Sequence, residues 1–248
     1  MDIAKTCIKN ISIIVPVYNE IDNLKILLDS INNTLAELSH CQHECIFVND
    51  GSTDGTREEL NQLAENIHTL HVVHLAQNYG QSAALIAGLR RARGEYIITL
   101  DGDLQNDPAD IPTFLDLLDS TDFVCGYRQK RQDTIVRRLS SRVANGVRNG
   151  ILHDGLHDAS CGIKGFRREC VPHIIAFNGI HRFMGAILKA AEKSVTESVV
   201  NHHPRIYGKS KYGIGNRLWR GIYDLVGVTW LQRRYITPEI ESESHPKP

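Results

Sequence analysis

The sequence has no long apolar run. Its longest apolar stretches, such as residues 11–17 and 96–100, are far shorter than the roughly 20 residues that cross a bilayer as a helix. The N-terminus also lacks the basic and then apolar pattern of a secretory leader. We therefore predict a cytosolic protein without a transmembrane helix.

Paired cysteines and two common phosphate-binding loops are also missing. The six cysteines form no CxxC pair, and the crowded segment SHCQHEC at 39–45 lacks the ligand spacing of a closed zinc site. We interpret this segment as a loop leading into a strand, and we expect reduced thiols. Neither GxGxxG nor GxxxxGK[ST] occurs, which argues against dinucleotide-dependent dehydrogenases and P-loop kinases.

Charge is unevenly distributed, although the net charge is only −1. Residues 1–125 carry 7 basic and 19 acidic side chains, whereas residues 126–234 carry 20 basic and 7 acidic ones. Such asymmetry is typical of a chain whose basic half meets nucleic acid, a membrane surface or a phosphorylated substrate. A solvated basic face is the alternative.

Residues 11–126 alternate short apolar runs with amphipathic stretches. This rhythm predicts an α/β fold with a mainly parallel sheet and helices on both faces. The predicted strands cover 11–17, 45–48, 70–75, 96–100 and 123–126, and the predicted helices cover 21–38, 54–64, 81–93 and 110–118. We assign residues 1–212 to this domain, 213–237 to a C-terminal amphipathic helix and 238–248 to a disordered tail.

Polar clusters follow three of the predicted strands. They are PVYNE at 16–20, NDGSTDG at 49–55 and DGDLQ at 101–105. Ligands of parallel sheets bind at the carboxyl ends of the strands, so these clusters are expected to converge in one crevice.

The third cluster predicts a metal site. Asp101 and Asp103 come directly after a buried strand, with a glycine between them and Gln105 two residues further on. Two carboxylates in this position suit a hard divalent cation that also binds a diphosphate. The alternative is a loop with two solvated acids.

The first two clusters predict a base-and-ribose pocket. Asp50 can accept hydrogen bonds from a base edge, and Glu20 can accept them from ribose hydroxyls. The alternative for residues 50–54 is an Asx turn that caps the next helix.

Two segments of the basic half are amphipathic. Segment 135–151 carries Arg137 and Arg142 near an apolar face, and segment 216–235 combines two tryptophans with flanking arginines. Arg220 and Asp224 interrupt the second segment, so it cannot span a membrane. We expect these helices to lie in a lipid interface; the alternatives are packing on the sheet or an oligomer interface.

Together, these residues resemble the family-2 glycosyltransferases of the GT-A fold, in particular the polyprenyl-phosphate branch that includes dolichyl-phosphate mannose and glucose synthases. The matching strings span about residues 11–213. They are ISIIVPVYNE, FVNDGSTDGT, NYGQSAALIAGLRRARGEYIITLDGDLQNDPADIP, VCGYR, DASCGIKGFRRE and YGKSKYG.

The resemblance implies roles for individual residues. The nucleotide pocket would be lined by Pro16, Val17, Tyr18, Asn19, Glu20, Asp50 and Ser52. Asp101, Asp103 and Gln105 would surround the metal, Mg²⁺ or Mn²⁺, and the diphosphate. Phosphates would be bound by Arg128, Arg205 and Lys211, with Arg137 and Arg142 as further candidates that are otherwise surface charges. Asp158 would face the acceptor, where we expect it to orient or balance arginines.

The sequence thus predicts metal-assisted transfer of one sugar from GDP-mannose or a UDP-hexose to a polyprenyl phosphate at the cytosolic face of a membrane, and the resemblance implies inversion at the anomeric carbon. No nucleic acid partner is expected. A second hypothesis keeps the transferase but has a glycan or lipopolysaccharide acceptor, which requires a general base. A third is a catalytically silent module that docks at a membrane. A homo-oligomer and a separate transmembrane partner both stay open.

Overall fold

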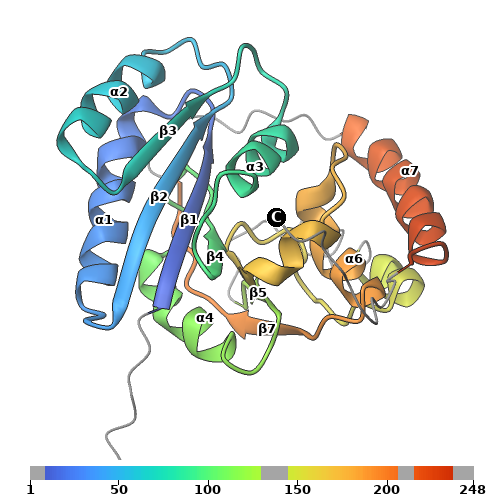
Figure 1. Ribbon diagram of the computed structural model, residues 1–248. Helices are drawn as coiled ribbons and strands as arrows, with labels where there is room; N and C mark the ends of the chain where they lie inside the picture. The colour runs from blue at the N-terminus through green and yellow to red at the C-terminus, as the bar shows by residue number, and fades with distance from the viewer. Residues whose placement is uncertain (1–8, 130–144, 206–214, 237–248) are drawn as a thin grey trace, which may run out of the picture.

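The computed structural model describes residues 9–129, 145–205 and 215–236, with side chains of the last segment described from residue 221. One seven-stranded sheet with the order β3-β2-β1-β4-β6-β5-β7 forms its centre (Figure 1). The strands are β1 Lys9–Val17, β2 Cys41–Asn49, β3 Leu70–His74, β4 Tyr96–Thr99, β5 Phe123–Tyr127, β6 Lys164–Arg167 and β7 Val195–Val199.

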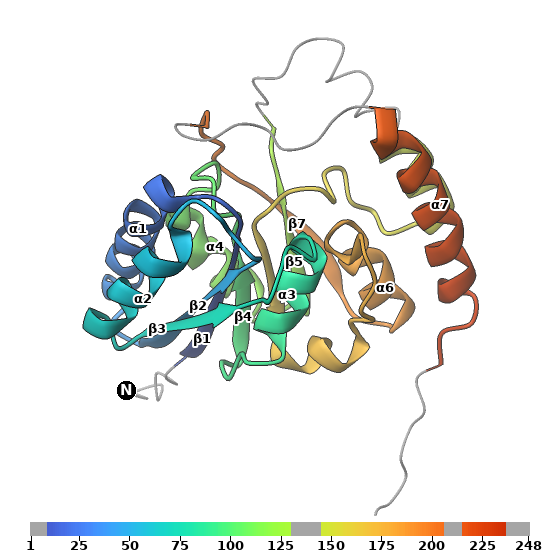
Figure 2. The ribbon, with the colours of Figure 1, turned by 90° about the horizontal axis from the view of Figure 1, so that it is seen from above.

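Helices cover both faces of the sheet. Figure 2 shows α1 Leu24–Ala36, α2 Thr56–Asn66 and α4 Ile111–Leu117 on one face, and α3 Gln81–Leu89 and α6 Met184–Ala190 on the other. Helix α7, Gly215–Gln232, packs outside α6. The predicted mainly parallel sheet with two covered faces is confirmed.

The buried side chains follow the predicted periodicity. The five apolar residues of α1 at helical spacing are all buried, and they pack with the central residues of β1 in one hydrophobic core. Ile13, Ile14 and Val15 of β1 are inaccessible to solvent because β1 lies between β2 and β4 and is covered on both faces. A rigid centre therefore carries the loops at the carboxyl edge.

The structure corrects the expected strand list. β6 pairs antiparallel with both β4 and β5, and β7 pairs parallel with β5. Neither strand was predicted, because KGFR and VTESV are short and lack a continuous apolar run. The segment 41–44, which we interpreted as loop, belongs to β2 and pairs with β1 from Cys41 onward.

The two amphipathic segments are only partly described. The structure shows a helix over residues 145–152 within the first segment, and α7 within the second. The tail 238–248 lies outside the described residues. Within the ranges that the structure describes, no helix is both long enough and apolar enough to cross a membrane.

Candidate active site

The carboxyl edge of the sheet brings together loops that lie far apart in the sequence. β1 runs parallel to β2 and β4, so the residues after Val17, Asn49 and Thr99 emerge side by side. The antiparallel strand β6 begins at the same edge, where Lys164 pairs with Thr99 of β4 and Cys125 of β5. A cation from β6 is thereby placed beside the acidic loop after β4.

The acidic loop turns tightly after β4. Gly102 packs against the end of β1, where an added Cβ would come within 2.8 Å of Val17 Cγ1. Leu104 adopts a left-handed conformation with φ 60°, and the Gln105 N–H donates to Asp103 Oδ1 at 3.2 Å. This turn places the Asp101 and Asp103 carboxylates in the same small region.

Asp101 is held from several sides. Its Oδ1 accepts from Gln81 Nε2 at 2.8 Å, and its N–H donates to Asn106 Oδ1 at 3.1 Å. An added Cβ at Gly162 would overlap its carboxylate, so only glycine fits there. Burial and the neighbouring Asp103 raise the pKa of Asp101 to about 6, although nearby cations oppose the shift.

Three cations surround the two carboxylates. Arg205 forms an ion pair with Asp103. The Lys164 ammonium is buried and donates to the Cys161 carbonyl, and its charge, like those of Arg128 and Arg205, favours the ionised form of Asp101. Opposite charges therefore meet at one end of the sheet, where an anionic ligand and a cation can bind together.

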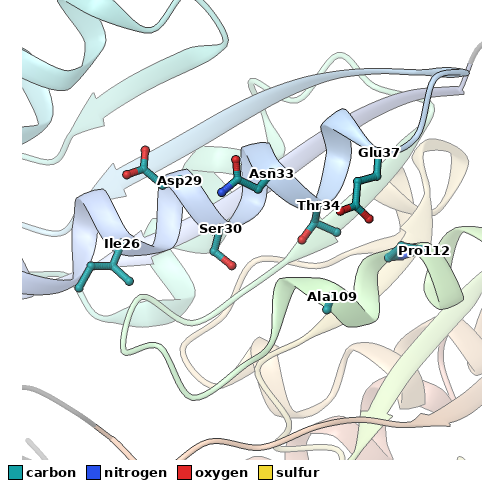
Figure 3. Close-up of a pocket in the computed structure, with 8 residues that line it drawn as sticks. All are labelled: Ile26, Asp29, Ser30, Asn33, Thr34, Glu37, Ala109 and Pro112. Atoms are coloured by element: carbon teal, nitrogen blue, oxygen red, sulfur yellow. The ribbon is translucent and has the colours of Figure 1, made fainter.

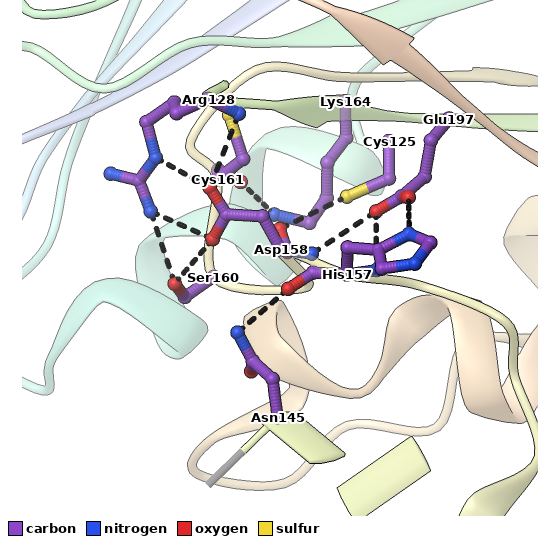
Figure 4. A network of polar contacts seen from close by, with 9 residues as sticks. All are labelled: Cys125, Arg128, Asn145, His157, Asp158, Ser160, Cys161, Lys164 and Glu197. Carbon is purple, nitrogen blue, oxygen red and sulfur yellow. Dashed lines mark hydrogen bonds and ion pairs between the residues drawn. The ribbon is translucent and has the colours of Figure 1, made fainter. Parts of the chain in front are cut away.

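Arg128 and Asp158 form a two-pronged ion pair (Figure 4). Arg128 Nε donates to Asp158 Oδ2 at 2.7 Å and Nη2 donates to Oδ1 at 2.9 Å. Ser160 Oγ donates to Asp158 Oδ1 at 2.9 Å, and Glu197 of β7 accepts from the Asp158 N–H at 3.0 Å. Asp158 is 2% exposed, and its bonds fix the guanidinium of Arg128. Burial lowers the pKa of Arg128, but the hydrogen bond and charge of Asp158 outweigh this effect and raise it.

The end of β1 and the loop after β2 are joined by polar contacts. Asn19 adopts φ 52°, and its N–H donates to Ser52 Oγ at 2.9 Å. Its side-chain oxygen accepts from the Thr53 N–H at 2.8 Å. The predicted nucleotide residues of these two loops are therefore neighbours.

Asp50 directly follows β2, next to these contacts, and is 3% exposed. Its two oxygens accept from the Tyr79 and Gly80 N–H groups, both at 2.8 Å. Burial raises the pKa of Asp50, and these two bonds oppose the shift. Since each carboxylate oxygen has two lone pairs, Asp50 can tie down the loop before α3 and still accept from a base edge.

The remaining predicted pocket residues are not equivalent. Val17 is buried, and its carbonyl accepts from the Asp50 N–H. Its side chain therefore belongs to the hydrophobic core and does not line the predicted pocket. Pro16 and Tyr18 are half-buried. Glu20 Oε2 accepts from Asn23 Nδ2 at 2.6 Å.

The oxygen ligands of the acidic loop suit a hard divalent cation that is also bound by groups from outside the protein. Asp101 and Asp103 supply two carboxylates, and no group of three or more His, Cys, Asp or Glu side chains in the described ranges is arranged to hold a metal. Gln105 belongs to the same loop, and its amide nitrogen contacts the His203 carbonyl at 3.5 Å. Diphosphate oxygens and water complete such a coordination sphere.

Several predicted residues cannot be placed, and others were missed. Arg137, Arg142 and Lys211 lie outside the described residues. Lys164 and Gln81 reach Asp101 but were not singled out from the sequence. The sequence held one signal for Lys164, because it is the lone charged residue in the glycine-rich string CGIKGF. A lysine in such a string, if buried, is expected to have a charged partner.

A surface groove lies elsewhere, between α1 and the start of α4 (Figure 3). Its lining includes Asp29 and Asn33 of α1 and Glu37 just after this helix, together with Ala109 and Pro112. It contains none of the residues of the acidic loop or of the nucleotide pocket, so the polar site described above is the candidate active site.

Comparison with known proteins identifies the relatives of this chain. The family model for glycosyl transferase family 2 matches residues 12–175. A dodecaprenyl-phosphate galacturonate synthase of Rhizobium johnstonii is 36% identical over 92% of this chain and 69% of its own length. An undecaprenyl-phosphate 4-deoxy-4-formamido-L-arabinose transferase of Klebsiella pneumoniae is 34% identical over 88% and 67%. The chain thus spans about two thirds of these relatives.

Solved structures share the fold at lower identity. A mannosyltransferase of Pyrobaculum calidifontis, in complex with GDP-Man and Mn²⁺, gives a TM-score of 0.62 at 18% identity and covers 92% of this chain and 65% of that one. A glucosyl-3-phosphoglycerate synthase of Mycobacterium tuberculosis, in complex with Mn²⁺, UDP and phosphoglyceric acid, gives 0.66 at 18% identity, with coverage of 93% and 80%. The predicted GT-A architecture is confirmed.

Proposed function

Because this chain belongs to glycosyl transferase family 2, as its motifs predicted, we propose that it transfers a sugar from a nucleotide-diphosphate sugar to a polyprenyl phosphate. The observation that carries the proposal is the pair of carboxylates, Asp101 and Asp103, facing Lys164, Arg128 and Arg205. The relatives named for dodecaprenyl and undecaprenyl phosphate support the choice of acceptor.

The donor side of the site is built by the three loops at the carboxyl edge. Asp50 and the Asn19–Ser52 junction receive the base and ribose, and Asp101 and Asp103 hold Mg²⁺ or Mn²⁺. When bound, the metal neutralises charge that builds up on the departing diphosphate. Asp101 is already fixed by Gln81 and Asn106, so little reorganisation is needed to bind an ion.

The acceptor side is cationic. A polyprenyl phosphate arrives as an anion, and Arg128, whose Nε and Nη2 are held by Asp158 and Ser160, can offer its Nη1 donors to a phosphate oxygen. Since an ionised phosphate is already a nucleophile, no general base is needed. The burial of Asp158 and its two bonds to Arg128 suit charge balance better than proton abstraction, which favours a phosphate acceptor over a glycan hydroxyl.

Transfer assays test this function directly. The protein is incubated with GDP-mannose or a UDP-sugar, Mn²⁺ and a short polyprenyl phosphate, and both nucleotide release and lipid-linked sugar are measured. Nucleotide release should require the lipid phosphate. Release at the same rate without the lipid, or with a glycan acceptor in its place, would contradict the acceptor assignment.

Asp103→Asn tests the metal role. We expect at least a 100-fold loss of turnover, because the substitution removes a charged ligand and the partner of Arg205. Asp116→Asn, at an exposed position of α4, is the matched control and should keep wild-type turnover. Near-normal activity of Asp103→Asn would exclude a metal role for this carboxylate.

The acceptor requires a lipid surface, and we propose that α7 contacts it. Tyr223, Val226 and Trp230 share one helical face and are 82%, 66% and 64% exposed. Arg233 and Arg234 are exposed just beyond the helix. Exposed aromatic and aliphatic side chains next to arginines are typical of helices that lie in an anionic lipid interface.

The opposite face of α7 packs against the rest of the protein. Val228 is buried, Asp224 pairs with Arg182 at 2.8 Å, and Gln232 Nε2 donates to the carbonyls of Leu152 and Ala186 at 3.3 and 2.9 Å. The helix is thus fixed with its apolar face outward. The acid within it, Asp224, points inward, so it does not repel an anionic membrane.

Flotation with anionic vesicles tests this surface. The double variant Val226→Ser/Trp230→Ser should lose most of its vesicle binding, because two exposed apolar side chains are removed. Ile26→Ser, at an exposed position of α1, is the control and should float like the wild type. If the wild type fails to float but forms a dimer that the double variant breaks, the face is an oligomer interface instead.

A further inference from the structure

A cluster of polar side chains lies behind the acidic loop, where the start of α3 meets the short 3₁₀ helix η4, Ile180–Arg182. The two elements pack directly on each other. The residues involved are Gln81 and Ser82 of α3 and Gly179 and His181 at η4. Ser82, Gly179 and His181 have no part in the proposed transfer reaction, and Gln81 enters it only through its contact with Asp101.

Gln81 provides the contact to the site. It is the first residue of α3, and its Nε2 donates to Asp101 Oδ1 at 2.8 Å. The other side of the Asp101 carboxylate lies against Gly162, where no side chain fits. The amide and the glycine backbone together restrict the carboxylate to one orientation.

Ser82 provides the anchor for Gln81. It is 4% exposed, and its Oγ accepts from the Gly179 N–H at 2.9 Å. The same oxygen lies 2.9 Å from His181 Nδ1. Oγ carries one proton and two lone pairs, so besides accepting from the Gly179 N–H it can hydrogen-bond the imidazole in either tautomer.

The surroundings of His181 fix its role in this contact. Burial and the nearby cations Lys164 and Arg182 lower the pKa of His181 to about 3, so the ring is neutral. A neutral ring that accepts at Nδ1 carries its proton on Nε2. The Gly179 amide and the neutral His181 ring thus hold the Ser82 hydroxyl through two hydrogen bonds.

We propose that Gln81 is a positioning residue for Asp101, and that His181, acting through Ser82, fixes the first turn of α3 so that Gln81 keeps this contact. The inference rests on the proposed function, because it assumes that Asp101 binds a metal ion. Partners that orient a metal ligand affect metal affinity 10- to 100-fold in other proteins.

Mn²⁺ binding in the presence of GDP or UDP, measured by calorimetry or electron paramagnetic resonance, tests the role of Gln81 without turnover. Gln81→Leu keeps the size of the side chain but removes the donor, and we expect its Mn²⁺ dissociation constant to rise about tenfold. Gln62→Leu, at an exposed position of α2, is the matched control and should bind Mn²⁺ normally.

The role of His181 is tested by a pair of substitutions at one position. His181→Asn places an oxygen near the position of Nδ1 and should retain near-normal Mn²⁺ affinity. His181→Leu removes the acceptor and should weaken Mn²⁺ binding several-fold. Melting temperatures identify variants that are merely unfolded, and Ser82→Ala provides a second, smaller change at the same contact.

The outcomes separate this inference from the proposed function. A wild-type protein that binds no Mn²⁺ with either nucleotide would overturn both. Normal wild-type binding, with a folded Gln81→Leu variant whose affinity stays within twofold, would overturn the role of Gln81 alone. Equal Mn²⁺ affinities in folded His181→Asn and His181→Leu would overturn the role of His181.

Discussion

Asp101 shows how a single residue can serve ligand binding at the expense of stability. Its carboxylate is placed near Asp103 and is partly shielded from water, and its pKa rises to about 6 as a result. The charged form is therefore less stable in the folded protein than in the unfolded chain. Lys164, Arg128 and Arg205 offset only part of this cost. A bound cation would offset more, because it adds positive charge directly beside both acids.

Asp101→Asn should therefore stabilise the protein at neutral pH while it reduces activity. The folded pKa of about 6 lies above the ordinary value of 3.8 for an aspartate, so the cost of the charge is absent below pH 4 and complete above pH 6. At pH 7.5 we expect a gain of about 1–3 kcal/mol in the free energy of unfolding, since solvent screens part of the shift.

Thermal melts over a pH series check this expectation. The difference in Tm between Asp101→Asn and the wild type should shrink as the pH falls from 7.5 towards 5. Asp116→Asn should show no comparable trend. A variant that melts below the wild type at every pH would mean that the ionised Asp101 is a net stabilising group.

At this scale, the sequence identified the residues that carry motifs and missed those that reach the site through packing. Asp101, Asp103, Arg128 and Asp158 stand in recognisable strings. Lys164 became visible only with the register of β6. The helix start at residue 81 was predicted, but the contact of Gln81 with Asp101 required the packing of α3 beside the acidic loop.

Among the elements, β6 differs most from expectation. The alternation of strands and helices predicted the parallel part of the sheet well, because those strands are buried apolar runs. It could not predict that a four-residue strand would enter between β4 and β5 from the opposite direction. Antiparallel insertion is what places the start of β6 at the carboxyl edge of its neighbours.

An ion pair between Arg182 and Asp224 connects α7 to η4. Arg182 and Asp224 are 32% and 17% exposed at their side chains, so the pair is partly shielded from solvent. Asp224→Asn should loosen the helix by about 1 kcal/mol, because it leaves the guanidinium with a weaker, neutral acceptor. Faster amide exchange within residues 221–232 is the expected observation.

Asp29→Asn is the matched control for this measurement. It breaks the exposed Lys25–Asp29 pair of α1, whose side chains are 67% and 50% exposed, and exposed pairs of this kind contribute little. Exchange in α1 should be nearly unchanged. If Asp224→Asn also leaves exchange in α7 unchanged, Val228 and Gln232 suffice to hold the helix.

On the scale of the whole molecule, the acidic and the basic half of the sequence form different parts of the fold. The acidic half of the sequence builds β1 to β5 with the proposed donor loops, and the basic half supplies β6, β7 and α7. Figure 1 shows α7 on the opposite side of the molecule from α1 and α2. The composition predicted an anionic partner for the basic half, but its location required the fold.

This arrangement predicts salt-sensitive membrane binding. We expect flotation with anionic vesicles to fall several-fold between about 0.05 and 0.5 M NaCl, because salt screens the attraction between arginines and lipid phosphates. Vesicles of neutral lipid should bind weakly at every salt concentration. Binding that is equally strong in high salt would assign the contact to the apolar face of α7 alone.

Two adjacent residues of η4 face in different directions. His181 reaches back to α3 and the acidic loop, while Arg182 reaches out to α7. The helix that we propose to contact lipid and, through α3, the proposed metal ligand Asp101 are thereby connected to the same short turn. If α7 binds lipid as proposed, a movement of this helix would be transmitted through η4 and α3 towards Asp101.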